Sequence, residues 1–115
     1  MTTILEFPYN VKGMNSKGGL IRGHWSAKKK EREKIVWGIL SQKYNQHPGQ
    51  VKITYTRRSP RLMDWDNLIS TFKNFGDSLV KAGVIRDDSP KVIPSSPEFK
   101  QEKGKAWTQI IIEDI

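Results

Sequence analysis

Residues 67–82 carry the pattern that most constrains how this chain folds, because large apolar side chains recur there at i, i+4, i+7 and i+11. An α-helix has about 3.6 residues per turn, so this spacing gathers the four side chains on one face. Gly83 follows directly, and glycine commonly ends helices in the left-handed conformation. The pattern predicts an amphipathic helix over residues 67–82 whose core-facing side chains are Leu68, Phe72, Phe75 and Leu79.

Three further segments have the pattern of β-strands. In QVKITYT (residues 50–56), apolar and polar residues alternate, which is typical of a strand with one buried face. The apolar positions of that segment are Val51, Ile53 and Tyr55. Apolar runs at residues 4–7 and 106–113 predict two more strands.

A second helix and three connections complete the outline. The helix is expected to begin with Ser26 as its N-cap and to end near Tyr44. Residues 10–24 contain four glycines and predict a flexible basic loop, while residues 57–61 (RRSPR) predict a basic turn. Residues 85–97 contain three prolines and predict an irregular segment. The β-α-β-α-β order predicts that all 115 residues form one small domain of the α/β or α+β class, with a mixed sheet and two helices.

The charge of the chain indicates a polyanionic partner. With 20 Lys and Arg against 12 Asp and Glu, the formal net charge is +8. Nucleic acid is the commonest partner of so basic a small domain, and solubility alone is the other explanation. No apolar run approaches the roughly 20 residues of a membrane helix, and no secretory pattern opens the chain, so we expect no membrane partner and a cytoplasmic location. The absence of cysteine excludes disulfides and thiolate metal sites.

Acidic residues gather around the 67–82 helix in spite of this positive charge. A polar stripe opposes the apolar one with the same spacing: Asp66, Ser70, Lys73 and Asp77. Asp64 lies just upstream, where an extended segment points its side chain to the same side as that of Asp66. Asp87 and Asp88 follow the helix, and the chain can return them beside its start. The sequence therefore predicts that these carboxylates converge.

Each acid also has an ordinary structural explanation. Asp66 suits the N-terminus of a helix as a cap. Lys73 and Asp77 suit an i, i+4 ion pair, and the pair at 87–88 suits an exposed turn. A converging cluster is less simply explained, since two carboxylates about 4 Å apart repel by roughly 1 kcal/mol in water and about 4 kcal/mol at an intermediate dielectric. A cation relieves this repulsion, and an all-oxygen ligand set favours Mg²⁺, or Mn²⁺ in its place, over Zn²⁺. Mg²⁺ beside a basic surface is typical of phosphodiester hydrolysis.

The residues around this helix resemble a known family. DWDNL, followed by FKNFGDSLVKAGVIRDDS, is similar to the central block of the RusA family of Holliday junction resolvases, which are common in phages and prophages. The family pattern is D-x-D-N-L, a helix with a lysine and a later aspartate, and then A-G-x-[hydrophobic]-x-D-D. The similarity covers Asp64 to Ser89, and FPYNVKGMNS near the N-terminus adds a weaker likeness. It implies a RusA-like fold and a Mg²⁺-dependent endodeoxyribonuclease that resolves four-way DNA junctions as a homodimer.

The resemblance assigns roles by position. Three carboxylates match the family's metal-binding and catalytic acids: Asp64, Asp66 and Asp88. Asp87 stands beside them as a further metal ligand. Lys73 matches the catalytic lysine, although it lies seven residues past Asp66, whereas the shortest members place the lysine one helical turn past. The motif downstream of Lys73 aligns with the lysine in this place, and the assignment is kept for that reason.

Basic residues outside this block are candidates for contacts with DNA phosphates. They lie in the glycine-rich loop, at the start of the first helix and in the basic turn: Lys17, Arg22, Lys28, Lys29, Lys30, Arg57, Arg58 and Arg61. Such runs are equally typical of a solvated surface, and both explanations stay open. Trp65 is expected to point away from a metal held by its two acidic neighbours, as a core residue or a dimer contact rather than a base-stacking residue.

The function predicted from the sequence is therefore paired cleavage of four-way DNA junctions in recombination and repair. Two alternatives remain open: a non-catalytic nucleic-acid binding module whose acids are structural, and a nuclease that acts on other branched DNA such as flaps. A symmetric homodimer is expected because residues 35–40, around Trp37, are apolar nearly all round the helix. The alternative is a monomer that buries all of these side chains internally.

Overall fold

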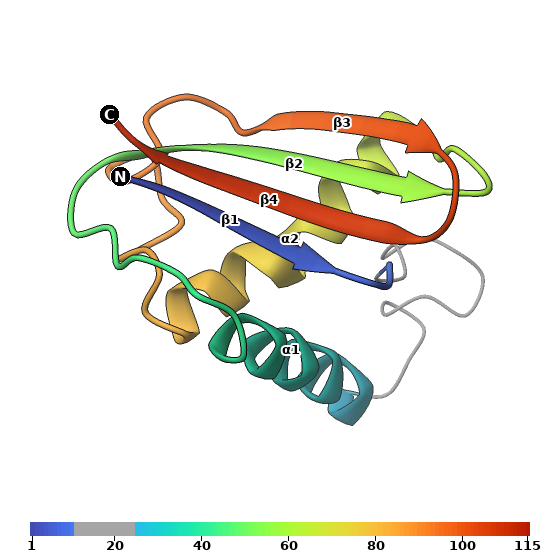
Figure 1. Cartoon of the computed structure of the whole chain (residues 1–115), viewed down its shortest axis with the longest axis horizontal. Helices are drawn as coiled ribbons and strands as arrows, with labels where there is room; N and C mark the ends of the chain where they lie inside the picture. Colours follow the sequence, from blue (N-terminus) through green and yellow to red (C-terminus); the bar gives the residue numbers. More distant parts are fainter. Residues whose placement is uncertain (11–24) are drawn as a thin grey trace.

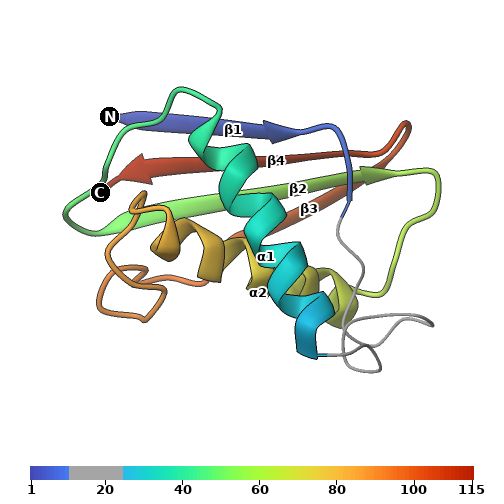
Figure 2. The same ribbon diagram turned by 90° about the horizontal axis from the view of Figure 1, so that it is seen from below.

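The computed structural model of the protein describes residues 1–10 and 25–115, with side chains described from residue 29 onward in the second range. Four strands form one sheet, and both helices lie on the same face of it (Figures 1 and 2). This confirms the predicted small α+β domain with a mixed sheet and two helices. The predicted loop over residues 10–24 lies outside the described residues except for Asn10. In chain order the elements are β1 (Thr2–Phe7), α1 (Trp25–Leu40), β2 (Val51–Ser59), α2 (Trp65–Lys81), β3 (Glu98–Lys103) and β4 (Trp107–Asp114).

The sheet has the strand order β1-β4-β2-β3. The last strand, β4, lies between β1 and β2 and is antiparallel to both. The outer strand β3 is parallel to β2, which makes the sheet mixed. Figure 1 shows β4 between β1, from the start of the chain, and β2, from its middle. The sheet is therefore completed only when the end of the chain inserts between two earlier strands.

The apolar stripe of α2 packs against the inner face of this sheet, as predicted. Phe72 and Phe75 contact the ring of Tyr55 in β2, with ring centroids 5.3 and 5.6 Å apart, respectively. The Tyr55 hydroxyl lies 3.0 Å from Thr71 Oγ1, so the one polar atom of this buried ring is satisfied. The buried apolar core consists of Leu5, Phe7, Ile35, Ile39, Val51, Ile53, Tyr55, Leu68, Phe72, Phe75, Leu79, Val84, Ile85, Ile93, Ile110 and Ile112.

α2 ends in the way that Gly83 predicts. Gly83 has a φ of 81°. Its N–H donates to the Val80 carbonyl at 3.0 Å, and the N–H of Val84 donates to the Leu79 carbonyl at 2.9 Å. This pair of bonds is the Schellman arrangement, which satisfies carbonyls that the helix end leaves open. The chain is thereby turned sharply toward the segment that carries Asp88.

The boundaries of α1 differ from the prediction at both ends. The helix begins at Trp25, so Ser26 lies inside its first turn and is not the N-cap. It ends at Leu40, several residues before Tyr44. The side chain of Gln42 accepts from the backbone N–H of Glu6 at 2.9 Å and donates to its carbonyl at 2.8 Å. These bonds hold the chain against β1 and favour an early end to the helix. Within the described residues, neither helix has the length and hydrophobicity needed to span a membrane.

Two predictions about the strands were wrong. Residues 57–59 are not a turn, because β2 continues through Ser59 and pairs with β3 and β4 along this stretch. Arg58 stacks over the ring of Trp107 in β4, 4.7 Å from its centroid. Residues 98–103 form β3, an edge strand that the sequence did not indicate. Its one large apolar residue is Phe99, so the strand has no apolar alternation to recognise.

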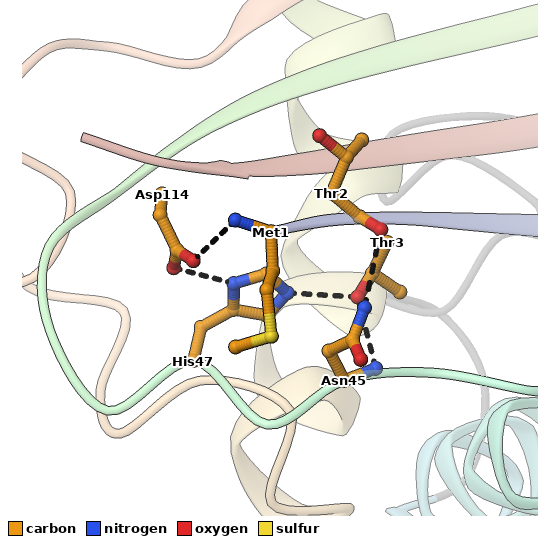
Figure 3. Close-up of polar contacts among 6 residues, drawn as sticks. All are labelled: Met1, Thr2, Thr3, Asn45, His47 and Asp114. Atoms are coloured by element: carbon orange, nitrogen blue, oxygen red, sulfur yellow. Dashed lines mark hydrogen bonds and ion pairs between the residues drawn. The ribbon is translucent and has the colours of Figure 1, made fainter.

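A buried histidine links the first strand, β1, to the end of its neighbour, β4 (Figure 3). His47 Nε2 lies 2.8 Å from Thr3 Oγ1, and His47 Nδ1 lies 2.7 Å from a carboxylate oxygen of Asp114. Thr3 Oγ1 already accepts the backbone N–H of Asn45 at 3.0 Å, so its own proton is available to His47 Nε2. We therefore assign the Nδ1–H tautomer, which donates to Asp114. The α-amino group of Met1 donates to the same carboxylate at 2.9 Å.

Candidate functional site

The N-terminus of α2 presents two carboxylates that the helix does not use. Asp64 is the N-cap, and its extended backbone has φ −61° and ψ 149°. Its backbone carbonyl accepts the N–H of Leu68 at 2.9 Å, but its side chain makes no capping hydrogen bond. Asp66 lies in the first turn, and both acidic side chains are exposed. The explanation of Asp66 as an N-cap is therefore wrong, and both acids are placed where a ligand can reach them.

A glutamine of the edge strand holds the segment before these acids. The Gln101 amide nitrogen donates to the Met63 carbonyl at 2.8 Å, and the Gln101 amide oxygen accepts the Met63 N–H at 3.0 Å. The Gln101 side-chain amide thus donates one hydrogen bond to the Met63 backbone and accepts one from it, as the backbone of a neighbouring β-strand would. The sequence analysis missed Gln101, because nothing in the sequence places residue 101 beside residue 63.

The polar stripe of α2 forms one wall of a groove of about 630 Å³. Asp66, Ser70 and Lys73 lie along this wall, and Asp88 joins them from the segment after the helix. Asp66, Lys73 and Asp88 therefore line one groove, but the predicted convergence of all the acids is not seen, because Asp64, Asp77 and Asp87 do not line it. Facing it are the proline-containing segment after Asp88 and the edge strand, which contribute Pro90, Ile93, Pro94, Ser95, Ser96, Pro97 and Phe99.

Asp77 makes a close contact with Asp88 at one end of the polar stripe. Burial raises the pKa of Asp77 first, and the charge of Asp88 and a hydrogen bond to its carboxyl group raise it further. Arg32 of α1 and Lys73 act in the opposite direction. Asp77 therefore takes up a proton more readily than an isolated aspartate does, as expected for a carboxyl group held beside a second one. The sequence analysis placed Asp77 on the stripe but paired it with Lys73 and did not include it in the site.

The adjacent acids 87 and 88 point to different places. The carboxylate of Asp87 accepts the backbone N–H of Asp88 at 2.8 Å and lies outside the groove, beside Pro48 and Arg86. The nearby side chain of Ser89, followed by this backbone bond, lowers the pKa of Asp87. The structure thus gives Asp87 a role in the turn and leaves Asp88 as the groove residue.

Some, but not all, of the carboxylates predicted to bind a hard cation line the groove. Across residues 1–10 and 25–115, no three His, Cys, Asp or Glu side chains come together as a metal-binding group. Mg²⁺ commonly takes only one or two protein carboxylates and completes its octahedron with water and phosphate. Asp66 and Asp88 both line the groove and each can offer carboxylate oxygens to a cation, but they lie toward different ends of the polar stripe, because Asp88 contacts Asp77, which lies several turns past Asp66. Asp64 is not among the residues that line the groove.

The residues predicted to contact phosphate fall into three groups: some lie outside the described residues, some are exposed, and two take part in the sheet. Lys17, Arg22 and the side chain of Lys28 lie outside the described residues. The side chains of Lys29, Lys30 and Arg61 are exposed.

Arg57 and Arg58 instead take part in the sheet. Within the described residues, Arg57 Nε is buried without a hydrogen-bond partner. Arg58 Nε donates to the Lys105 carbonyl at 3.0 Å while its guanidinium covers Trp107. The side chain of Trp65 is 60% exposed, so the prediction of a core position for it was wrong, and its alternative role as a dimer contact stays a prediction.

Comparison with known proteins leaves the resemblance to the RusA family untested. No protein-family model matches the chain, and no curated protein matches it. The function is therefore argued from the groove and its residues.

Proposed function

We propose that this protein is a Mg²⁺-dependent endonuclease that hydrolyses phosphodiester bonds in branched DNA, with the four-way junction as its main substrate. The observation that carries the proposal is the groove wall on which Asp66, Lys73 and Asp88 meet. Acids and a lysine on one accessible surface suit phosphoryl chemistry, and the net charge of +8 suits a DNA ligand. The proposal places the activity in the cytoplasm.

The groove residues have distinct tasks in this proposal. Asp66 and Asp88 supply carboxylate oxygens for Mg²⁺ or Mn²⁺. When bound, the cation supplies a more acidic water and neutralises the scissile phosphate. The Lys73 ammonium donates hydrogen bonds to phosphate oxygens and balances the negative charge that grows on them in the transition state. Asp77, beside Asp88, is not assigned a ligand role in this proposal.

The test is incubation of the pure protein with labelled four-way junction, flap and duplex DNA, with and without Mg²⁺. We expect Mg²⁺-dependent cleavage of the junction. Asp64→Asn, Asp66→Asn and Asp88→Asn should each abolish cleavage and leave junction binding unchanged or tighter, because each removes a cation ligand and one negative charge that faces DNA. Asp87→Asn is the matched control, since Asp87 adjoins Asp88 but lies outside the groove.

The outcomes separate the competing functions. Wild-type cleavage rates in all three variants, Asp64→Asn, Asp66→Asn and Asp88→Asn, would exclude the nuclease. Tight junction binding with no cleavage by the wild-type protein would favour the binding module, and cleavage of flaps alone would favour the other nuclease. Lys73→Ala should cleave slowly yet melt normally, because its side chain is exposed, and Lys81→Ala in the last turn of α2 is its control.

We further propose that the protein acts as a symmetric homodimer. Cleavage of a four-way junction requires two nicks in strands related by a two-fold axis, and a C2 dimer offers two equivalent sites. Trp37 and Leu40 support an interface on α1, since their side chains are 72% and 48% exposed while Ile35 and Ile39 are buried. Sedimentation of Trp37→Ala and Leu40→Ala should show weaker dimers, whereas Leu62→Ala, an exposed leucine elsewhere, should not. A wild-type protein that stays monomeric on a junction would exclude the dimer.

A further inference from the structure

The groove beside the acids is too large and too apolar to serve a phosphate and a cation alone. Its charged side chains lie on the α2 wall, which carries Asp66 and Lys73, and at Asp88. Its floor is formed by the nearly buried side chains of Phe72 and Ile93 together with the half-buried ring of Phe99. A ligand that fills the whole groove therefore needs a charged part and a flat or apolar part next to each other.

The aromatic floor is held firmly in place. The rings of Phe72 and Phe99 meet edge to face with centroids 5.6 Å apart, and both contact Tyr55 of β2. Such edge-to-face contacts fix the orientation of each ring. The groove thus has a preformed apolar surface, which lowers the entropy cost of binding a rigid planar group.

Ile69 extends this apolar surface to solvent. It lies on α2 between Asp66 and Lys73, lines the groove, and is 50% exposed. An apolar side chain between an acid and a lysine does not help to hold phosphate or cation. It does suit a group that lies directly beside the phosphate.

We propose that the groove receives one unpaired nucleobase of the DNA strand whose phosphate lies at Lys73 and Asp88. A nucleotide has the required two parts, since its base is joined to its phosphate through a single sugar. Bases bind proteins by stacking on aromatic and apolar side chains, and extruding a base costs least where pairing is already broken, as at a branch point. This inference rests on the proposed nuclease function and deepens it, because it gives the groove a means of selecting branched over duplex DNA.

The experiment measures binding and base environment together without Mg²⁺, so that no cleavage is required. The probe is a four-way junction in which 2-aminopurine, a fluorescent adenine analogue, replaces one base at the branch point. The protein variants are wild type, Ile69→Asn and Ile4→Asn. Ile4 is the matched control because it is an isoleucine with 51% exposure, and its buried neighbours Thr3 and Leu5 place it on the sheet face opposite the helices. Neither substitution changes the charge, so phosphate attraction stays constant.

The expected result is a change in 2-aminopurine emission when the wild type or Ile4→Asn binds, and loss of that change with Ile69→Asn. Junction affinity should fall about tenfold in Ile69→Asn alone, the size of effect expected when one stacked base is lost. Ile69→Val should restore both signals. If Ile69→Asn melts at a much lower temperature than wild type, Ile69→Ser takes its place.

The outcomes distinguish this inference from the proposed function. Equal affinity and emission for wild type and Ile69→Asn would overturn the nucleobase site even if the junction is cleaved with Mg²⁺. An emission change in a protein that cleaves nothing would support the site and overturn the nuclease. Conversion of a dimer to a monomer by Ile69→Asn would show that a second copy of the chain covers the groove, and would also overturn the nucleobase site.

Discussion

Gln101 and Met63 are joined by two hydrogen bonds, of 2.8 and 3.0 Å, between a side-chain amide and a backbone peptide group. The pair links the edge strand β3 to the residue immediately before Asp64. The segment that presents the acids is thus held by the same strand that supplies Phe99 to the opposite wall of the groove. The edge strand β3 therefore contacts both the segment that carries Asp64 and the groove itself.

Loss of this link should destabilise the start of α2. We expect Gln101→Ala to lower the free energy of unfolding by about 1–2 kcal/mol, because two hydrogen bonds are lost. Amide hydrogen exchange at Leu68, whose N–H donates to the Asp64 carbonyl, should become faster than in wild type, while exchange in the middle of the helix should change less. Urea unfolding and exchange rates measure both effects. Gln109→Ala is the control, since Gln109 makes one bond of 3.3 Å to Glu6. Equal stability in the two variants would show that the Gln101 pair contributes nothing.

The raised pKa of Asp77 predicts how stability changes with pH. A carboxyl group that binds its proton more tightly in the folded state stabilises the fold at low pH, and this contribution is lost as the pH rises through the folded pKa. Asp77→Asn should therefore melt at a higher temperature than wild type at pH 7, with little difference at pH 3. Thermal melts across this range provide the measurement. Wild type that is the more stable protein at pH 7 would contradict the contact with Asp88.

Mg²⁺ should act on the same acids. If the cation binds at Asp88 in the groove, it raises the melting temperature of wild type at pH 7 by mass action. Asp88→Asn should lose most of this increase, and Asp87→Asn should retain it. Melting curves at increasing Mg²⁺ measure the effect without any DNA. An equal rise in both variants would place the cation outside the groove.

Asp114 gives the fold an acid-sensitive link. The hydrogen bond from His47, and next the one from the Met1 amine, lower the pKa of Asp114 below its ordinary value. Such a group stabilises the fold above its unfolded pKa, and the contribution is lost as the pH falls through the folded pKa. Asp114→Asn should therefore be less stable than wild type at pH 6, and the difference should shrink below pH 4. Glu113→Gln, an exposed neighbour, should show no such convergence in acid melts.

Gly83 should resist substitution. Because its φ is 81°, an alanine there would occupy the left-handed region at a cost of about 1 kcal/mol, which corresponds to roughly 4 °C in melting temperature. Gly49→Ala is the control, because a Cβ at Gly49 meets nothing within 4 Å and its φ is ordinary. Calorimetry measures the melting temperatures of the two variants. An unchanged melting temperature for Gly83→Ala would contradict the Schellman ending of α2.

The charge of the surface should appear in the salt dependence of DNA binding. The logarithm of junction affinity should fall linearly with the logarithm of salt concentration, by about 0.9 for each phosphate neutralised. Arg61→Gln should flatten this slope if the exposed Arg61 contacts a phosphate. Lys52→Gln should not, since Lys52 lies near the other end of β2, 3.5 Å from Glu98. A slope close to zero for wild type would leave the positive charge without a role in DNA binding.

The sequence by itself determined the elements whose patterns are local. The two stripes of α2 and the stop at Gly83 follow from the helical period, and the buried face of β2 follows from alternation. These are properties of consecutive residues, so they hold wherever the element packs. The placement of Asp66 and Lys73 on one face follows from the same period, which is why both were predicted together.

Only the tertiary structure decided which segments meet. Asp87 and Asp88 are identical in type and adjacent in sequence, yet only Asp88 enters the groove, because the turn after α2 uses the other carboxylate for its own hydrogen bonds. Gln101 binds Met63 because β3 adds to the edge of β2, and no local pattern encodes that pairing. Long-range contacts depend on the strand order and on the path of every connection, so the partners of a side chain are fixed only once the whole sheet is assembled.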